Sequence, residues 1–280
     1  MVPLALKKQV RRPVLWFRHL AVGPDDSLVC SYPRSGSTWL RFLLYEALTR
    51  EPATFQAVNR AIPDPDGYRS APGLLPSGGR LLKSHDRYGP KGKRVVYLVR
   101  DVRDVVVSEY RHHVREGTFR GELTDFLQPF LDGRITYFGS WSDHVRFWAL
   151  DARVPPEDLL VLRYESLRES TVDRVADVLA FLDAVVGRSA VENAVRNNDI
   201  GRMRRKEEEA PEGVIHTVDS RMRFVGRGLV GGWEQELTEA QRDQIERRAG
   251  DVLARLGYPV PGETRSDRLA PAPDAPGPTD

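Results

Sequence analysis

Short apolar runs alternate along the chain with segments in which apolar residues recur every three or four positions. The run at 94–99 reads RVVYLV and is almost uninterrupted, which is typical of a parallel strand buried on both faces. Strands are predicted at 27–31, 80–84, 94–99 and 159–163. The first strand and the helix that follows it are predicted to occupy about 27–48. Helical periodicity predicts further helices at 102–114, 138–150, 172–184, 189–197 and 238–256. This alternation predicts a single doubly wound α/β domain with a central parallel sheet.

Several stretches depart from this pattern. We interpret the basic, mixed stretch 1–26 as an N-terminal extension that carries no chemistry, and the Pro-rich stretch 259–280 as a disordered tail. The domain proper is therefore predicted to span 27–258. Within it, 50–79 is rich in Pro, Gly and Asp and is predicted to be a lid or binding loop. The charged stretch 200–218 is predicted to be mobile.

Composition narrows the function classes. The 280 residues include 42 Lys and Arg against 40 Asp and Glu, a net charge of +2, which argues against a general nucleic-acid binder. Cys30 is the single cysteine, so an intrachain disulfide framework is excluded. No apolar run approaches the ~18 residues of a membrane span, and charges interrupt the N-terminus too early for a signal peptide. We expect a cytoplasmic protein without a membrane or nucleic-acid partner.

The loop between the first strand and its helix has the chemistry of an anion site. Residues 31–39 read SYPRSGSTW, and a strand that turns into a helix N-terminus presents free N–H groups to a ligand. The loop lacks the terminal Lys followed by Ser or Thr that a magnesium-dependent Walker A motif needs. Alternatively, it is an ordinary strand–turn–helix connection with a solvated Arg. The predicted donors, with Trp39 as a stacking face, are Arg34, Ser35, Gly36, Ser37 and Thr38.

Two polar side chains lie at the end of the second predicted strand, Lys83 within it and His85 directly after it. His85 has an ordinary pKa near ~6.5, which suits proton removal at neutral pH. Lys83 projects to the same side of the extended chain, where its charge could stabilise negative charge that develops in a reaction. The alternatives are a surface or capping histidine and a solvated lysine at a strand end.

Further anion ligands are predicted at the other strand ends. Arg100, at the tip of the third strand, and Ser108, two turns into the next helix, could reach one anion together. Alternatively, Arg100 pairs with Asp101 or Asp104. We interpret the acidic and basic residues 101, 103 and 104 as caps and surface ion pairs. Near the C-terminus, 227–233 reads RGLVGGW, a backbone-rich anion candidate or a simple turn.

Taken together, these segments resemble the sulfotransferases that use 3′-phosphoadenosine 5′-phosphosulfate (PAPS). Five blocks match in family order between Ser27 and about Leu256: YPRSGSTW at 32–39, KSH at 83–85, RDVRDVVVS at 100–108, YE at 164–165 and GRGLVGGW at 226–233. Three positions depart from the family pattern. Arg34 replaces the usual Lys, Gly226 replaces an Arg, and Gly232 replaces an Asp. Arg221 or Arg223 could supply the cation missing at Gly226.

The resemblance implies a P-loop-like cradle for PAPS, without a metal. By this resemblance, residues 34–39 hold the 5′-phosphosulfate, Trp39 packs on the adenine, and His85 is the catalytic base. Lys83 and Arg34 would stabilise the charge of the transferring group. Residues expected to bind the nucleotide elsewhere, mainly at its 3′-phosphate, are Arg100, Ser108, Tyr164, Arg227 and Gly228.

The resemblance implies a small-molecule hydroxyl acceptor, which by analogy with bacterial relatives could be a secondary metabolite, and it allows a homodimer. Candidate acceptor-lining residues, left unassigned, are the loop 50–79, Tyr88, Phe119, Tyr137, Phe138 and Trp141. Two alternatives stay open. A P-loop-type nucleoside or small-molecule kinase would need a GK[ST] motif and a magnesium carboxylate, and neither is evident. A silent nucleotide-binding relative would not need the Lys83–His85 pair.

Overall fold

The computed structural model of the chain describes residues 19–87, 94–210, 223–226 and 228–260. Most of the predicted N-terminal extension and nearly all of the predicted disordered tail lie outside these residues. Tyr88, Arg221 and Arg227 lie outside them as well.

Four strands form one parallel sheet in the order β2-β1-β3-β4. They are β1 (Ser27–Ser31), β2 (Leu81–Ser84), β3 (Arg94–Val99) and β4 (Leu159–Arg163). Ser27 of β1 pairs with Leu81 on one side and with Arg94 on the other, and Val95 of β3 pairs with Leu159. The predicted parallel sheet is confirmed, with the first and third strands at its centre.

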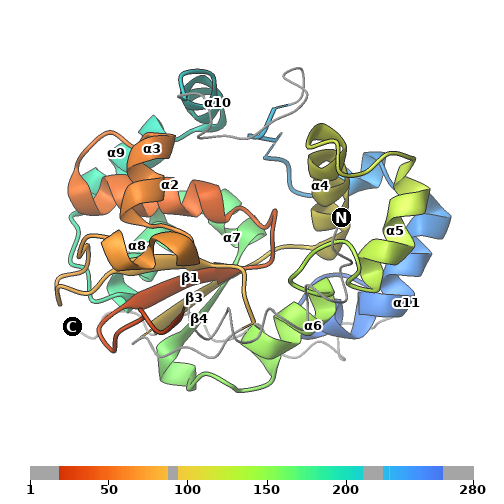
Figure 1. The fold of residues 1–280 in the computed structure, drawn as a ribbon, viewed down its shortest axis with the longest axis horizontal. Coiled ribbons are helices and arrows are strands. Elements are labelled where there is room, and N and C mark those ends of the chain that lie inside the picture. Colours follow the sequence, from red (N-terminus) through yellow and green to blue (C-terminus); the bar gives the residue numbers. More distant parts are fainter. Residues whose placement is uncertain (1–18, 88–93, 211–222, 227, 261–280) are drawn as a thin grey trace.

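Alternate residues of the central strands face two separate cores. Val95, Tyr97 and Val99 of β3 belong to one buried cluster, whereas Val96 and Leu98 belong to the other. Successive side chains of a strand point to opposite faces, so a strand that is apolar throughout requires helices on both faces. Figure 1 shows these two helical layers, and the fold is the single α/β domain that the sequence predicts.

The helices on the first face pack against the even-numbered residues of β3. Their buried leucines and valines meet Val96 and Leu98 in one cluster. These elements are α2 (Ser37–Thr49), α7 (Tyr164–Glu169), α8 (Thr171–Phe181) and α9 (Arg188–Asn197).

The helices on the second face pack against Tyr97 and its neighbours. They are α4 (Val102–Arg115), α5 (Leu123–Leu131), α6 (Trp141–Val145) and α11 (Glu239–Arg255). The helix predicted at 138–150 begins only at Trp141 and continues as a π-helix over Arg146–Leu150. Short 3₁₀ turns occupy Pro156–Asp158 and Gly232–Gln235.

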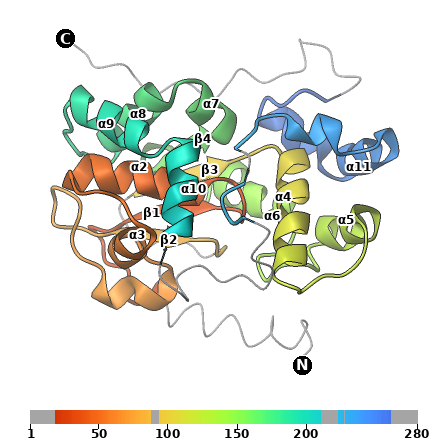
Figure 2. The same cartoon turned by 90° about the horizontal axis from the view of Figure 1, so that it is seen from above.

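Two segments that we expected to be irregular contain helices. The predicted loop 50–79 holds α3 (Phe55–Ala61), which begins at the N-cap Thr54, and a 3₁₀ helix at Pro65–Ser70. The segment predicted to be mobile begins with α10 (Ile200–Glu208). Its N-cap is Asp199, whose carboxylate accepts a hydrogen bond from the Arg202 N–H at 2.8 Å. Figure 2 shows α10 between α2 and α4. No helix in the described part of the chain is long and apolar enough to cross a membrane.

Candidate active site

The carboxyl ends of the strands border one cavity of about 600 Å³. Ligands of open α/β sheets bind at this edge, and each strand contributes a polar or aromatic residue that we predicted from the sequence. The predicted residues that line the cavity are Arg34, Gly36, Ser37, Thr38, Trp39, Lys83, His85, Arg100, Ser108, Tyr164 and Gly228. Ser35 is fully buried and does not line it.

The backbone of the loop after β1 leaves the start of α2 open to a ligand. Arg34 has a φ of 61° and Gly36 a φ of 101°, so both adopt left-handed conformations. A Cβ on Gly36 would lie 2.6 Å from the Tyr164 ring, which restricts this position to glycine. No side chain caps α2, and its first turn has no acidic residue. The helix therefore offers free N–H groups and a positive dipole end to an anion.

Arg34 is the cation of this loop, and it lies against α4. Its Nε donates to Ser108 Oγ at 3.2 Å, and its Nη2 donates to the Phe224 carbonyl at 3.1 Å. Burial lowers the pKa of Arg34 to about 10, which leaves the guanidinium charged at neutral pH. Two residues that we predicted for opposite ends of the nucleotide, Arg34 and Ser108, are thus direct neighbours.

The ring of His85 is held in one tautomer. Its Nδ1 lies 2.6 Å from the Ser31 carbonyl oxygen, which can only accept a hydrogen bond, so Nδ1–H is the donor. In the neutral ring Nε2 is then unprotonated and free to take a proton. Burial, and next the charge of Lys83, lower the pKa of His85 to about 3. The phenyl ring of Phe138 lies edge-on at 5.5 Å.

A buried chain of hydrogen bonds fixes the backbone of His85. His144 Nε2 lies 3.0 Å from the His85 carbonyl oxygen, and the Tyr97 hydroxyl lies 2.9 Å from His144 Nδ1. The carbonyl can only accept, so Nε2 of His144 donates and Tyr97 donates to Nδ1. Nothing in the sequence pattern singled out His144, because it lies inside the aromatic helix at 138–150.

Lys83 has a partner that the sequence did not predict. Its ammonium lies 2.7 Å from the carboxylate of Asp64, which is about half exposed at the start of the 3₁₀ helix Pro65–Ser70. Burial lowers the pKa of Lys83. For Asp64, burial raises the pKa, but Lys83 and His85 outweigh it and the net shift is downward. The Pro-Asp-Pro-Asp stretch at 63–66 was the available signal, and we interpreted it only as loop.

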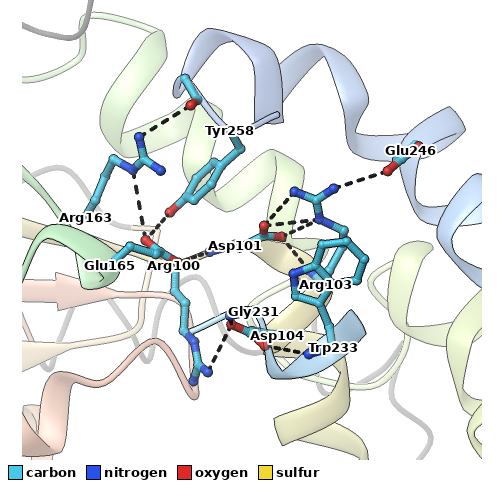
Figure 3. Close-up of polar contacts among 11 residues, drawn as sticks. Arg100, Asp101, Arg103, Asp104, Arg163, Glu165, Gly231, Trp233, Glu246 and Tyr258 are labelled. Carbon is cyan, nitrogen blue, oxygen red and sulfur yellow. Dashed lines mark hydrogen bonds and ion pairs between the residues drawn. The ribbon is translucent and has the colours of Figure 1, made fainter. Parts of the chain in front are cut away.

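Arg100 and Asp104 join the third strand end to the glycine-rich C-terminal segment (Figure 3). Asp104 accepts from the Gly231 N–H at 3.0 Å and the Trp233 N–H at 3.1 Å. Arg100 lies 3.4 Å from Asp104, donates to the Leu229 carbonyl at 2.9 Å, and stacks over the Tyr164 ring at 4.6 Å. The alternative pairing of Arg100 with Asp104 is therefore present.

The neighbouring charges are not surface ion pairs. Asp101 caps the Arg103 N–H at 2.9 Å, as expected, but the side chains of Asp101, Arg103 and Asp104 are all buried. Figure 3 shows why: Arg103 is enclosed by Asp101, Glu246 and the Trp233 ring. The interpretation as surface pairs is wrong, because the C-terminal segment and α11 cover this end of α4.

Trp39 and Phe224 add aromatic surface. The Trp39 indole donates to the Asn198 carbonyl at 2.8 Å and lies 6.2 Å from the Tyr164 ring. Phe224, which we did not predict, lines the cavity with its ring 5.0 Å from the Arg34 guanidinium carbon. Both aromatics pack against the same small apolar cluster, which is centred on Phe42 and Phe55.

The residues left unassigned for the acceptor lie in different places, and no described residue of the loop 50–79 is among those that line the cavity. Tyr137 and Phe138 line the cavity, and Trp141 is buried in the core. Phe119 packs against the core and Tyr88 is outside the described residues.

The second half of α4 also lines the cavity with ionisable side chains, which we did not predict from the sequence: Glu109, Arg111, His112, His113 and Arg115.

Comparisons with known proteins agree with one another. A family model described as "Sulfotransferase domain" matches residues 79–257. Bovine sulfotransferase 1A1 is 29% identical over 258 residues, which cover 82% of this chain and 84% of the relative. Mouse sulfotransferase 1B1 is 26% identical over 248 residues, with 80% and 81% covered.

Solved structures share the fold. Mouse sulfotransferase SULT7A1, complexed with 3′-phosphoadenosine 5′-phosphate (PAP), has a TM-score of 0.61 at 22% identity, with 82% of this chain and 84% of that chain covered. Retinol dehydratase in a complex with retinol and PAP has a TM-score of 0.66 at 19% identity, with 89% and 88% covered. At these identities the likeness shows the fold alone.

Proposed function

Because this chain belongs to the sulfotransferase family, we propose that it transfers the sulfonyl group of PAPS to a hydroxyl of a small molecule, with His85 as the base. Membership makes the protein a transferase. PAP, the desulfated product of PAPS, is bound in the mouse SULT7A1 and retinol dehydratase structures, which supports PAPS as the sulfonyl donor. Retinol, an alcohol, is bound together with PAP in the latter complex, which supports a small-molecule acceptor. We propose a cytoplasmic location.

The cavity suits a large anion. The uncapped start of α2 offers N–H groups to the phosphosulfate, and Arg34 and Lys83 add fixed charge. On the other side, the buried Nε of Arg100 has no hydrogen-bond partner in the described part of the chain. Arg100 therefore retains a donor for the 3′-phosphate next to Ser108 and Gly228. Arg223 lines the cavity and is our candidate for the cation missing at Gly226. Trp39 and Tyr164 would contact the nucleoside.

The observation that carries the proposal is the contact between His85 Nδ1 and the Ser31 carbonyl at 2.6 Å. It leaves Nε2 as the proton acceptor. As the acceptor oxygen attacks sulfur in line, its proton passes to Nε2, the new O–S bond forms, and the bond between sulfur and the bridging phosphate oxygen breaks. Lys83 and Arg34 stabilise the charge on the departing phosphate. Positioning and electrostatics supply most of the catalysis, as in phosphoryl transfer.

The P-loop-type kinase is not supported by the comparisons, which match sulfotransferases. One pair of measurements tests the function. In a thermal-shift assay, PAP should raise the melting temperature more than ATP with magnesium does. Labelled PAPS with panels of phenols, aliphatic alcohols, sugars and nucleosides should then yield a labelled sulfate ester and PAP. Binding of PAP without transfer to any acceptor would favour the silent nucleotide-binding relative.

A further inference from the structure

One wall of the cavity is polar along its length, although the reaction as described does not use it. Beyond Ser108, α4 presents Glu109, His112, His113 and Arg115 to the cavity. Another part of the wall is apolar and comes from Ile135 and Phe138. An acceptor in this space therefore meets apolar contacts and ionisable groups together.

Glu109 and Arg115 are the buried groups on this wall that have polar atoms without a hydrogen-bond partner among the described residues, and Glu109 is the one that can accept a hydrogen bond. Its side chain is 1% exposed, and its Oε1 has no hydrogen-bond partner among the residues that the structure describes. Its Oε2 lies 3.6 Å from His113 Nε2, which is too long for a good hydrogen bond. Burial raises the pKa of Glu109 to about 7. A buried polar atom without a partner is energetically unfavourable, so a bound molecule that supplies the partner gains affinity.

Glu109 lines the same cavity as Thr136 and Phe138, the residues on the side of the base His85. Its charge acts on the Tyr32 hydroxyl, whose pKa is raised first by burial and then by Glu109. That hydroxyl lies 3.4 Å from Thr136 Oγ1. Thr136 and Phe138 line the cavity, and Phe138 is the ring that contacts His85.

Glu109 and Arg34 act at this place with opposite charges, so neither a cation nor an anion is favoured by both groups. Arg34 acts electrostatically on Glu109, so an ammonium group placed there would be repelled by the guanidinium. A carboxylate or phosphate would be repelled by Glu109 in its ionised form. A hydroxyl can donate to an ionised Glu109 and can both donate to and accept from a protonated one, so it suits either state.

We propose that Glu109 binds a second hydroxyl of the acceptor, distinct from the one that is sulfated. The acceptor class is then a ring compound with at least two hydroxyls, whose ring packs on Phe138 and Ile135. This inference rests on the proposed function and identifies its substrate class. Glu109 sets specificity and takes no part in bond making.

The test compares matched acceptors. Ring diols that differ in the distance between their two hydroxyls are each paired with mono-ols in which the second hydroxyl is replaced by hydrogen or methoxy. The kcat/KM of each acceptor is measured with PAPS. A site built to hydrogen-bond a hydroxyl strongly rejects the analogue that lacks it, so we expect the best diol to exceed its mono-ol by at least about 10-fold. Glu109→Leu should reduce this ratio to about 1, and Glu109→Gln should retain a preference.

Controls separate the possible failures. Glu192→Leu removes an exposed carboxylate on α9 that does not line the cavity, and it should keep the full ratio. Calorimetry of diol and mono-ol binding to the wild-type protein with PAP gives a readout that does not depend on the folding of any variant, and tighter diol binding is expected. The second-hydroxyl site alone would be overturned by either of two results. One is equal kcat/KM and equal affinity for diols and mono-ols, and the other is an unchanged ratio of diol to mono-ol kcat/KM in Glu109→Leu. Failure to sulfate every acceptor would overturn the proposed function and this inference with it.

Discussion

At the scale of single residues, the protonation of His85 depends on two neighbours of opposite charge. After burial, Lys83 is the largest influence that lowers the pKa of His85, and Asp64 acts in the opposite direction. The two are themselves paired at 2.7 Å. Asp64 is therefore a positioning residue in our account, because it orients the Lys83 ammonium beside the base.

Replacing Lys83 should change both rate and pH dependence. Lys83→Met removes a positive charge next to the imidazole, so the pKa of His85 should rise and the acidic limb of kcat/KM should move to higher pH. The turnover should fall roughly 10²-fold, the range for loss of one fixed charge-stabilising group. Asp64→Asn removes a negative charge and should shift the limb in the opposite direction. If the acidic limb moved in the same direction in both variants, or in neither, Lys83 and Asp64 would not have opposite effects on the pKa of His85.

The sequence predicted the strand-end residues and missed their partners. Lys83, His85 and Arg100 were predictable because each lies in the last residues of an apolar strand or directly after it, and parallel strands end at one edge. Asp64 and Glu109 were not. The first lies in a Pro-rich stretch without periodicity, and the second lies on a helix where a glutamate is ordinarily a solvated residue.

At the scale of elements, α4 and the C-terminal glycine segment form one unit. Asp104 accepts two backbone N–H groups of that segment, from Gly231 and Trp233, and Arg100 binds its Leu229 carbonyl. These contacts place Gly228 at the cavity. The cation Arg100 and the glycine segment are thus fixed together, although 128 positions separate Arg100 from Gly228 in the sequence.

Loss of the Asp104 carboxylate should weaken nucleotide binding. Asp104→Ala leaves two backbone N–H groups without their acceptor, so the segment should detach and the Kd for PAP should rise at least about 10-fold, equal to the loss of roughly 1.4 kcal/mol. Isothermal titration measures this directly. Asp173→Asn, an exposed carboxylate on α8, serves as the control and should bind PAP normally. Unchanged PAP affinity in Asp104→Ala would show that the docking contact is not needed.

Element prediction succeeded where periodicity was long and failed where it was short. The strands and the long helices α4 and α11 were predicted nearly to their ends. The helix α3 was missed because seven residues give only two turns, and its buried positions Phe55, Val58 and Ala61 lie among prolines and glycines. The helix α10 was missed because it buries only Met203 and is otherwise charged.

At the scale of the whole molecule, the sheet separates two cores, and one of them holds buried ionisable groups. His144 is completely buried beside Tyr97, and burial lowers its pKa to about 3. The alternation of strands and helices predicted the two-layered packing. The strand order was not predictable, because it depends on side-chain packing between distant segments.

The buried imidazoles should make the fold sensitive to acid. A histidine whose pKa is near 3 when folded and near ~6.5 when unfolded takes up its proton only in the unfolded chain between these values. The free energy of unfolding is therefore highest above about pH 6.5 as far as these groups are concerned. It falls as the pH decreases, by roughly 2 kcal/mol per such histidine at pH 5. Thermal melts from pH 7.5 to 4.5 test this. His144→Gln should flatten the dependence, and an unchanged slope would contradict the role of this group.

The most direct test of the account is single-turnover sulfonyl transfer from labelled PAPS by the wild-type protein and by His85→Ala. Removal of a general base costs about 10²–10⁴ in rate, and His85 binds no part of the nucleotide in our proposal. We therefore predict that the transfer rate falls within that range while the Kd for PAP stays within about 2-fold of the wild-type value. Near-normal transfer by His85→Ala would contradict the assignment of His85 as the base.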